Sequence, residues 1–548
     1  MRGLMMDFPL TLAALLRHTE RSHGGQEVVS RGSDRSLQRY TYGDCLERAR
    51  RLGAALRGLG ARPGDRIATF CWNHGRHLEA YYGVPASGFV LHTLNIRLHH
   101  DELAYIATHA GDRIVVVDKA LWPAFEKFAK NVSFEHVVVV TDDGSVPDGT
   151  ISYDHLVEGA TPEPFPDLPD ENAAAAMCYT SGTTGKPKGV VYSHRALVLH
   201  TLGASIPDIF GIGGSDTVLP VVPMFHANAW GLPFAAALAG AKQILPGQFL
   251  DPQSIVELLE RERVTVAAGV PTIWAGILQY LDANPRKHDL SRIRFMIVGG
   301  SAVPESMLRS FQERHGLRIV QAWGMTEMSP LGSITSLRSD LDSLDADARY
   351  AYGATQGMAA PFVEIRARNE DGIVPWDNAT MGELEVRGPW ISSGYYHADD
   401  DGREKFTDDG WFRTGDVVTI AQGGHITIQD RSKDLVKSGG EWISSVQLES
   451  ALMGHPDVAE AAVVAVAHPK WAERPLAVVV PKAGCQPTAA SLIAHLADKF
   501  PKWWLPDDCV LTDTLPRTAT GKLKKTDLRV TYRDHYAGAP KAEKAFAM

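Results

Sequence analysis

Short apolar runs alternate with helical patterns over the first half of the chain. The runs RIATFCW at 66–72, RIVVVD at 113–118 and VTVAAGV at 264–270 are almost continuously apolar, and a stretch with helical spacing of apolar residues follows each of them. A strand that is apolar on both sides is typical of a parallel sheet, because helices then cover both faces. The pattern from about residue 40 to about residue 300 therefore predicts α/β sheets.

The pattern changes twice in the second half of the chain. From about residue 350 to about residue 430, short alternating strands are separated by glycine turns, as in GELEVRG at 382–388, and this predicts a small antiparallel β unit. After Arg431, a helical pattern precedes two apolar strands, which predicts a compact α+β module. We therefore expect an N-terminal domain at 1–429, a hinge at 430–433 and a C-terminal domain at 434–548.

Composition and charge narrow the class of protein. Hydrophobic residues make up 44% and charged residues 22% of the 548 residues, which are the values of an ordinary globular protein. The net charge of −10 shows no excess of basic residues of the kind that nucleic-acid-binding proteins have. The five cysteines form no C-x-x-C pair, which argues against a disulfide framework and a zinc site and indicates a reducing compartment.

The N-terminus does not have the pattern of a signal peptide. Its short apolar stretch is interrupted by Asp7 and Pro9, and no cleavage site of small residues follows. We expect an amphipathic helix there instead. No apolar run in the sequence approaches the ~18 residues of a membrane-spanning helix. These observations predict a cytoplasmic protein without a membrane span.

The stretch YTSGTTGKPKG at 179–189 is the first candidate for chemistry. Its glycines let backbone N–H groups approach an anion, its hydroxyls add donors, and Lys186 and Lys188 add charge. The common phosphate loop has the pattern G-x-x-x-x-G-K-[ST], but here Pro187 follows the Gly-Lys pair, and the pair Gly521-Lys522 also lacks the Ser or Thr. A P-loop NTPase is therefore excluded. A flexible surface turn is the alternative at this point, because such clusters are common in loops.

Four further motifs decide between a phosphate site and a surface turn. They are AWGMTEMSP at 322–330, DGWFRTGDV at 409–417, DRSKDLVKSGGEWISSVQLE at 430–449 and PRTATGK at 516–522. With the loop, and in this order, they resemble the adenylate-forming enzymes, and nearly the whole chain is similar to the AMP-forming bacterial medium- and long-chain fatty-acyl-CoA synthetases. The resemblance implies a large N-terminal part of two α/β subdomains and a β-barrel, followed by a small mobile α+β C-terminal domain.

Enzymes of this superfamily join a carboxylate to AMP with release of pyrophosphate, and the CoA ligases then pass the acyl group to the thiol of coenzyme A. The resemblance therefore implies a fatty acid or another carboxylic acid, ATP and CoA as substrates, Mg²⁺ as cofactor, and a homodimer as one assembly state. A ligase for a short or substituted acid, such as 3-methylthiopropanoate, is the alternative within this class. A luciferase-like oxygenase shares the first half-reaction and is the more distant alternative.

The resemblance assigns roles to residues of these motifs, with Lys522, His226 and Glu327 as the catalytic residues. Lys522 is expected to neutralise the carboxylate and the α-phosphate, because lysine is a mobile point charge on a flexible stem. Thr180 and Glu327 are the expected ligands of Mg²⁺, and Asp416 is expected to accept hydrogen bonds from the ribose. The expected ATP and AMP site comprises Thr180, Ser181, Gly182, Thr183, Thr184, Gly185, Lys188, Gly300, Gln321, Ala322, Trp323, Thr326, Asp416, Arg431 and Lys433.

Acyl and CoA contacts complete the expected site. His226, Trp230 and Gly300 are expected to contact the acyl substrate, with Trp230 at the mouth of a tunnel and on the same helical face as His226. The stretch GLPFAAALAGA at 231–241 fits a tunnel wall and a buried helix equally well. A rotation of the C-terminal domain is expected to withdraw Lys522 and to bring in the CoA-binding residues. These are Lys437, Ser438, Gly439, Gly440, Glu441 and Trp442.

Overall fold

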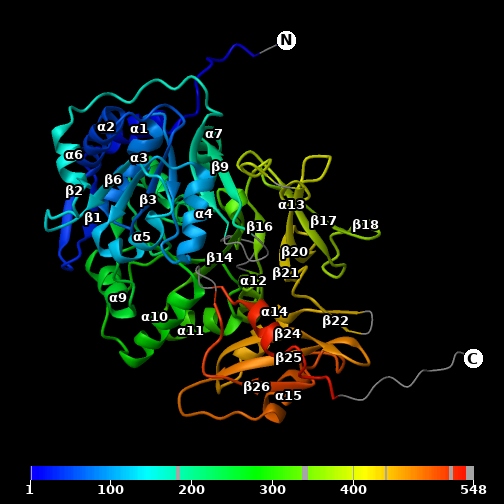
Figure 1. Ribbon diagram of the computed structural model, residues 1–548. Helices are drawn as coiled ribbons and strands as arrows, with labels where there is room; N and C mark the ends of the chain where they lie inside the picture. The colour runs from blue at the N-terminus through cyan, green and yellow to red at the C-terminus, as the bar shows by residue number, and fades with distance from the viewer. Residues whose placement is uncertain are drawn as a thin grey trace, which may run out of the picture.

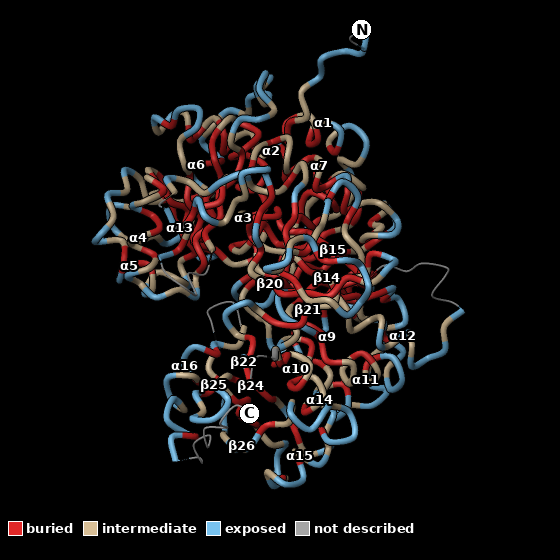
Figure 2. The backbone as a smooth tube through the Cα atoms, turned by 90° about the vertical axis from the view of Figure 1, so that its right-hand side faces the viewer, coloured by how far each residue is buried: buried red, intermediate tan, exposed pale blue. Residues whose placement is uncertain are grey.

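The chain forms a large body and a smaller one. The computed structural model describes the backbone of residues 1, 3–180, 186–335, 343–398, 400–438, 441–517 and 522–538. The large body contains the N-terminal part of the chain, and the smaller body below it contains the C-terminal strands and helices (Figure 1). Buried residues fill the interior of both bodies (Figure 2). The α/β fold class with a large N-terminal and a small C-terminal domain is confirmed.

The first sheet has seven strands in the order β7-β6-β5-β3-β4-β8-β9. Neighbouring strands are parallel except for β8 and β9. Two of the predicted apolar runs form β3 and β5, which are buried almost throughout. The strands are β3 (Arg66–Phe70), β4 (Val90–Thr93), β5 (Ile114–Asp118), β6 (His136–Val140), β7 (Ile151–Ser152), β8 (Ala174–Tyr179) and β9 (Gly189–Ser193). The helices of this region are α1 (Leu12–His23), α2 (Tyr42–Gly58), α3 (Gly75–Ala86), α4 (His100–Ala110), η1 (Lys119–Leu121), α5 (Trp122–Ala129), α6 (Tyr153–Gly159) and α7 (His194–Ala204).

The second sheet has fourteen strands in the order β18-β17-β19-β20-β21-β16-β15-β14-β13-β12-β10-β11-β1-β2. Strands from β14 to β1 in this order are parallel, and the rest of the sheet is antiparallel. The strands are β1 (Glu27–Arg31), β2 (Leu37–Thr41), β10 (Thr217–Pro220), β11 (Lys242–Leu245), β12 (Val266–Gly269), β13 (Phe295–Val298), β14 (Ile319–Gly324), β15 (Leu331–Ile334), β16 (Gly357–Ala359), β17 (Glu364–Asn369), β18 (Gly372–Ile373), β19 (Gly382–Arg387), β20 (Phe412–Ile420) and β21 (His425–Arg431). The helices are η2 (Ala227–Gly231), α8 (Leu232–Ala239), α9 (Pro252–Arg261), α10 (Pro271–Ala283), α11 (Glu305–His315), η3 (Thr326–Met328), α12 (Ala346–Gly353) and α13 (Asp400–Arg403).

The expected β-barrel is not closed among the described strands. The predicted antiparallel unit instead extends the second sheet, whose order ends at β18. The connection between the two parts of this sheet is β14, which changes its pairing along its length. Its first residues pair in parallel with β13, and from Ala322 onward it pairs antiparallel with β15. The antiparallel unit therefore begins as a continuation of an existing sheet edge.

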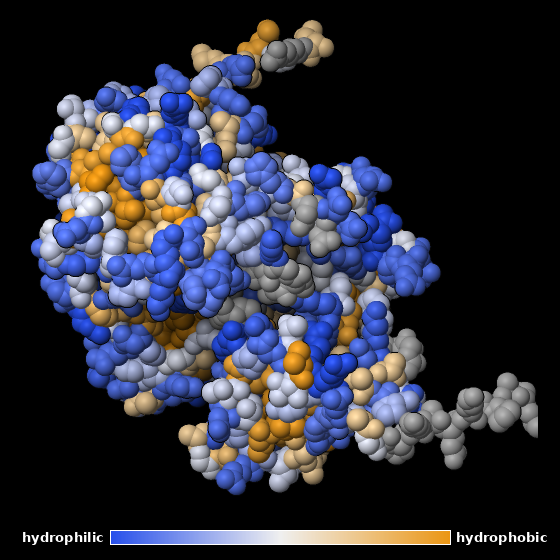
Figure 3. Space-filling view, viewed as in Figure 1, coloured by the Kyte–Doolittle hydropathy of each residue, from blue (hydrophilic) through white to orange (hydrophobic). Residues whose placement is uncertain are grey.

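The predicted N-terminal helix begins later than the apolar stretch. It starts at Leu12, because the side chain of Thr11 accepts a hydrogen bond from the backbone N–H of Ala14 and caps the first turn. Its buried face includes Leu15 and Leu16, so it is amphipathic as expected. Within the described ranges, no helix is long and apolar enough to cross a membrane. The face shown in Figure 3 is mostly hydrophilic, with apolar side chains in small groups.

The C-terminal module has its own sheet and core. β24 and β25 form a long antiparallel pair, and β22 and β26 pair with β25. The apolar side chains of α14 and α15 pack against this sheet. The elements are β22 (Val436–Ser438), β23 (Glu441–Ile443), α14 (Ser445–Met453), β24 (Val458–His468), β25 (Ala472–Pro481), α15 (Ala489–Ala497), β26 (Asp508–Leu511) and α16 (Lys525–Thr531).

The ends of four parallel strands determine where a ligand site can lie. Thr180 follows β8, residues 221–226 follow β10, Gly299 and Gly300 follow β13, and residues 325–327 follow β14. All four segments contribute to the lining of one cavity. Ligands of α/β proteins typically bind at the carboxyl ends of the strands, because loops and exposed backbone N–H groups gather there.

Candidate active site

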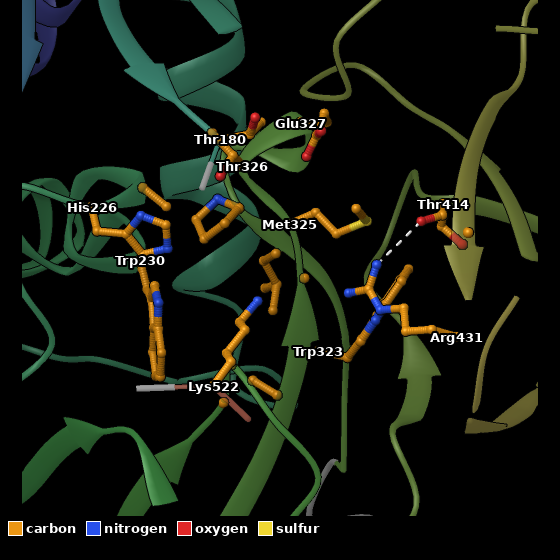
Figure 4. Close-up of a pocket in the computed structure, with 18 of the residues that line it drawn as sticks. Thr180, His226, Trp230, Trp323, Met325, Thr326, Glu327, Thr414, Arg431 and Lys522 are labelled. Atoms are coloured by element: carbon orange, nitrogen blue, oxygen red, sulfur yellow. Dashed lines mark hydrogen bonds between the residues drawn. The ribbon is translucent and has the colours of Figure 1, made fainter. Parts of the chain in front are cut away.

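Side chains from distant parts of the chain line a cavity with a volume of ≈ 770 Å³. Lys522 points into the cavity, with His226 and Trp230 on one side and Trp323 and Arg431 on the other (Figure 4). The expected residues that line it are Thr180, Lys188, His226, Trp230, Gly300, Ala322, Trp323, Thr326, Glu327, Arg431, Lys433 and Lys522. The structure thus brings all three residues that are expected to be catalytic into one cavity.

One end of the cavity lies beside the base of the glycine-rich loop. The backbone N–H of Thr180 donates to the carbonyl oxygen of Lys188 at 3.0 Å, and the N–H of Lys188 donates to Thr180 Oγ1 at 3.1 Å. Lys186 and Lys188 both line the cavity, so this end carries positive charge that suits phosphate. The other expected members of the loop lie outside the described residues; they are Ser181, Gly182, Thr183, Thr184 and Gly185.

Glu327 lies in the short helix η3 directly after β14. The hydroxyl of Tyr192 donates to the carbonyl oxygen of Thr326 at 2.7 Å and holds this turn in place. Glu327 is 5% exposed, and its Oε1 accepts a hydrogen bond from the hydroxyl of Tyr395 at 2.6 Å. Glu327 and Thr180 both line the cavity, and their oxygens are the kind of ligand that Mg²⁺ prefers. The described residues therefore fit the expected magnesium site.

Two residues expected in the nucleotide site lie one layer behind the cavity wall. Asp416 is 1% exposed; its Oδ2 accepts from Trp323 Nε1 at 2.9 Å and its Oδ1 pairs with Arg431 Nε at 2.6 Å. Gln321 is 2% exposed, and its side-chain oxygen accepts from the backbone N–H of Val303 at 3.1 Å. Asp416 thus orients Trp323 and Arg431, while Gln321 braces the segment after Gly300.

The charges around Lys522 change the protonation of the site. The pKa of Lys522 is lowered to about 8, mainly by burial; the nearby cations Arg431 and Lys433 act in the same direction, while Asp416 and Glu327 oppose them. The pKa of His226 is lowered to about 4, first by burial and then by Lys522 and Arg97. At neutral pH the cavity therefore contains a lysine cation close to its pKa and an uncharged imidazole.

The segment from His226 to Trp230 is not the helix that the spacing predicts. Residues 227–230 all have φ between 44° and 58°, which is the left-handed region that L-residues rarely adopt. His226 and Trp230 reach the same cavity through this left-handed turn, so the argument from a shared helical face is wrong. The ring of Trp230 packs against the backbone of Gly299, where a Cβ atom would lie 3.1 Å from the ring.

The small-residue segment 231–241 forms a buried helix and does not line this cavity. Leu232, Phe234 and three alanines of α8 are buried in the core of the large body. The hydroxyl of Tyr82 donates to the carbonyl oxygen of Pro233 at 2.9 Å and fixes the first turn. Of the two interpretations of this segment, the structure favours the buried helix.

The sequence profile described as AMP-binding enzyme matches residues 16–396, and the profile described as its C-terminal domain matches residues 447–522. The chain belongs to the AMP-binding enzyme family. The long-chain-fatty-acid–CoA ligase of Thermus thermophilus is 49% identical to it, over 98% of this chain and 98% of that protein. The 3-methylmercaptopropionyl-CoA ligase of Ruegeria pomeroyi is 43% identical, over 98% of this chain and 100% of that protein. The crystal structure of ATP-bound MatB from Rhodopseudomonas palustris has a TM-score of 0.83 and 27% identity, covering 96% of this chain and 100% of that chain.

The residues expected to bind CoA lie elsewhere in this AMP-binding enzyme. Lys437 and Trp442 face each other across the hairpin of β22 and β23, with the ammonium 5.9 Å from the ring centroid. Ser438 Oγ accepts a hydrogen bond from Arg474 Nη1 at 3.1 Å. None of these three residues lines the cavity. Gly439 and Gly440 lie outside the described residues, as does the side chain of Glu441.

Several residues that line the cavity have no signal in the sequence motifs. Tyr395 comes from the loop between β19 and α13, and Arg97 from the segment after β4. Neither residue belongs to a glycine-rich or charged cluster, and neither has a periodic pattern. The apolar residues Phe225 and Ile273 also line the cavity, but their sequence context is that of ordinary core residues.

Proposed function

We propose that this AMP-binding enzyme ligates a fatty acid to coenzyme A through an acyl-adenylate, with ATP as co-substrate and release of AMP and pyrophosphate. The observation that carries the proposal is that Lys522, from near the C-terminus, points into the cavity that Thr180, Glu327 and Trp323 also line. Lys522 provides a mobile cation, and Thr180 marks the end of the cavity that suits phosphate. Glu327 provides a carboxylate for a metal ion, and Trp323 provides an aromatic wall.

The chemical difficulty of the first step explains why cations gather there. A carboxylate must approach the α-phosphate of a polyanion, so electrostatic stabilisation and positioning are the main contributions that the protein can make. Lys522 neutralises the charge between the carboxylate and the α-phosphate, and Lys188 holds the outer phosphates. Mg²⁺, when bound by Thr180 and Glu327, supplies further charge neutralisation on the phosphates. The uncharged His226 donates or accepts a hydrogen bond beside the carboxylate.

We place the nucleoside against the opposite wall. Trp323 lies against the adenine, with Gly300 and Ala322 beside it. Asp416 contacts the ribose, assisted by Arg431. This assignment requires the ribose hydroxyls to share the carboxylate with Trp323 Nε1 and Arg431 Nε, and each carboxylate oxygen has a second acceptor position for this purpose.

The apolar part of the lining supports an alkyl substrate. Phe210, Val221, Val222, Phe225 and Ile273 line the same cavity as Trp230. An apolar wall of this kind stabilises an alkyl chain by removing it from water, at about 0.8 kcal/mol for each buried CH₂ group. The alternative within the class is a ligase for a short or substituted acid such as 3-methylthiopropanoate, and it is favoured by the relative from Ruegeria pomeroyi.

The second half-reaction requires a different arrangement. We propose that rotation of residues 434–548 about the hinge 430–433 withdraws Lys522 and brings the hairpin with Lys437 and Trp442 to the cavity, where CoA then enters. The position of that hairpin away from the cavity fits the adenylation arrangement. The hinge and both domain boundaries are part of this proposal.

The decisive experiment is a series of carboxylic acids from propanoate to palmitate, tested with ATP, Mg²⁺ and CoA. Release of AMP should depend on both the acid and CoA and should be greatest for medium or long chains. A preference for propanoate-sized acids would favour the short-acid alternative. Absence of any acyl-CoA product, with light emission from a luciferin, would contradict the ligase itself.

Location and assembly complete the proposal. All five cysteines are free in the structure, which fits a reducing compartment such as the cytoplasm. A homodimer is proposed from the sequence resemblance. Light scattering of the pure protein measures the assembly directly, because a dimer has twice the mass of the 59.7 kDa chain.

A further inference from the structure

The segment 390–396 connects the two sides of the proposed magnesium and phosphate site. On one side, Ser392 N donates to the carbonyl oxygen of Glu327 at 2.7 Å, and Ser329 Oγ donates to the carbonyl oxygen of Trp390 at 2.9 Å. On the other side, Tyr396 N donates to the carbonyl oxygen of Gly189 at 2.8 Å, at the strand that leaves the glycine-rich loop. The segment is therefore bonded to both the Glu327 turn and the loop.

Tyr395 lies at the centre of this segment and lines the cavity. Its hydroxyl donates to Glu327 Oε1 at 2.6 Å, a length typical of a strong hydrogen bond to a carboxylate. Its ring lies under the ammonium of Lys188, 5.5 Å from the centroid, which is within cation–π range. Phe406 packs edge-on against the same ring at 5.8 Å and restricts its rotation.

From these contacts we infer that Tyr395 is a positioning residue that fixes Glu327 and Lys188 relative to each other. The inference rests on the proposed function, in which Glu327 binds Mg²⁺ and Lys188 binds phosphate. The hydroxyl holds Oε1, and Oε2 accepts no hydrogen bond from a described residue, so it stays available to a cation.

Tyr395→Phe is the sharpest test, because it removes the hydroxyl and keeps the ring beneath Lys188. Loss of a residue that orients a metal ligand typically lowers metal affinity by 10- to 100-fold. We expect the Mg²⁺ concentration for half-saturation to rise about 10-fold in the variant. The readout is calorimetric binding of an α,β-methylene analogue of ATP at a series of Mg²⁺ concentrations, in which no turnover occurs. Tyr396→Phe is the matched control, since that ring packs on His109 and His397 outside the cavity, and it should leave the half-saturation unchanged.

A second variant tests the ring separately. Tyr395→Leu removes the hydroxyl and the aromatic face, so binding of the analogue without Mg²⁺ should be about 2- to 5-fold weaker than in Tyr395→Phe. Equal metal-free binding in the two variants would overturn the role of the ring. Near-ultraviolet circular dichroism of each variant establishes that the compared proteins have the same folded fraction.

The double variant with Glu327→Gln separates this inference from the proposed function. Glu327→Gln alone should raise the Mg²⁺ requirement, and adding Tyr395→Phe should then change it little, because the two side chains act as one unit. If Glu327→Gln leaves the requirement unchanged, the metal role of Glu327 fails, and the positioning role fails with it. If Glu327→Gln raises it but Tyr395→Phe does not, or if the two increases are fully additive, only the role of Tyr395 is overturned.

Discussion

The surroundings of Lys522 lower its pKa. Burial and the cations Arg431 and Lys433 lower its pKa to about 8. The charged form of Lys522 is therefore less stable, relative to the neutral form, than that of a lysine on the surface. Burial, followed by the charges of Lys522 and Arg97, lowers the pKa of His226 to about 4, so its imidazole is uncharged at neutral pH. Because the pKa of Lys522 lies close to neutral pH, a small rise in pH removes its charge. The pH dependence of the reaction can therefore show whether that charge is needed.

The first prediction concerns the pH dependence of adenylation. The cation of Lys522 is present below pH 8 and is lost as the pH rises through about 8. The value of kcat/KM for ATP should therefore decline above about pH 8, because this parameter reports the pKa values of the free enzyme. Pyrophosphate exchange at saturating fatty acid measures it. The control is Lys522→Arg, whose residual activity should lack this decline because arginine stays charged. The same decline in the Arg variant would assign it to another group.

The second prediction concerns Trp230, whose ring lines the cavity against Gly299. Trp230→Ala should leave the melting temperature nearly unchanged and alter the preference for chain length, because the ring lines the cavity that is proposed to hold the substrate. Trp274→Ala is the control, since Trp274 is fully buried and its loss should lower stability by about 3–5 kcal/mol. Melting curves measure the stability of both variants, and AMP release across the series of carboxylic acids measures their preference for chain length. A loss of stability in Trp230→Ala as large as the control's would identify Trp230 as a core residue.

At the scale of elements, local patterns predict strands and helices better than they predict how these pair. The apolar runs that become β3, β5 and β12 are visible in the sequence because burial on both faces leaves few polar positions. The barrel was expected from resemblance, but the pairing of β14 with both β13 and β15 depends on contacts between distant segments. The left-handed turn at 227–230 has little sequence signal either, because Asn228 is the one residue of the four that tolerates positive φ readily, while alanine and tryptophan do not favour it.

Helices α14 and α16 are joined by a buried ionic network beside the proposed hinge. Lys525 Nζ pairs with Glu449 Oε1 at 2.7 Å and donates to Ser445 Oγ at 2.5 Å. Ser445 in turn donates to Asp430, through its backbone N–H at 2.8 Å and through its hydroxyl. The segment that carries Lys522 is thus tied, through α16, to the residue at which the hinge is expected to begin.

The third prediction follows from that network. Lys525→Ala leaves the carboxylate of Glu449 buried without its cation, and breaking a buried pair in this way typically costs about 3–5 kcal/mol. The first transition of urea unfolding should move to a clearly lower concentration. Lys524→Ala is the control, because that lysine is exposed and its one ion pair among the described residues is with Asp527 on the surface, where such a pair contributes about 0–1 kcal/mol. Equal midpoints for the two variants would show that the network does not stabilise the C-terminal module.

At the scale of the whole molecule, residues of both the large and the small body line the cavity. The five motifs identified the family and contain half of the residues that line the cavity, because the chemistry of phosphate, metal and ribose restricts which residue types are useful. The sequence did not reveal that Tyr395 joins the Glu327 turn to the glycine-rich loop, because tyrosine in a loop has no pattern of its own. Nor did it reveal that Asp416 and Gln321 are bonded to residues beside the cavity without lining it themselves, and their contact with the nucleotide stays a prediction.

The arrangement of the two bodies leads to the last prediction, in which two variants should affect opposite half-reactions. Lys522 lies in the cavity, while Trp442 lies on a hairpin away from it. Lys522→Ala should abolish adenylation, measured by pyrophosphate exchange, and should leave thioester formation from a prepared acyl-adenylate largely intact. Trp442→Ala should leave adenylation largely intact and abolish thioester formation, because the proposed rotation brings its hairpin to the cavity for the second step alone. Lys524→Ala should change neither step, since its side chain is exposed. If each variant slows both half-reactions equally, a single fixed arrangement serves both steps and the rotation about residues 430–433 is contradicted.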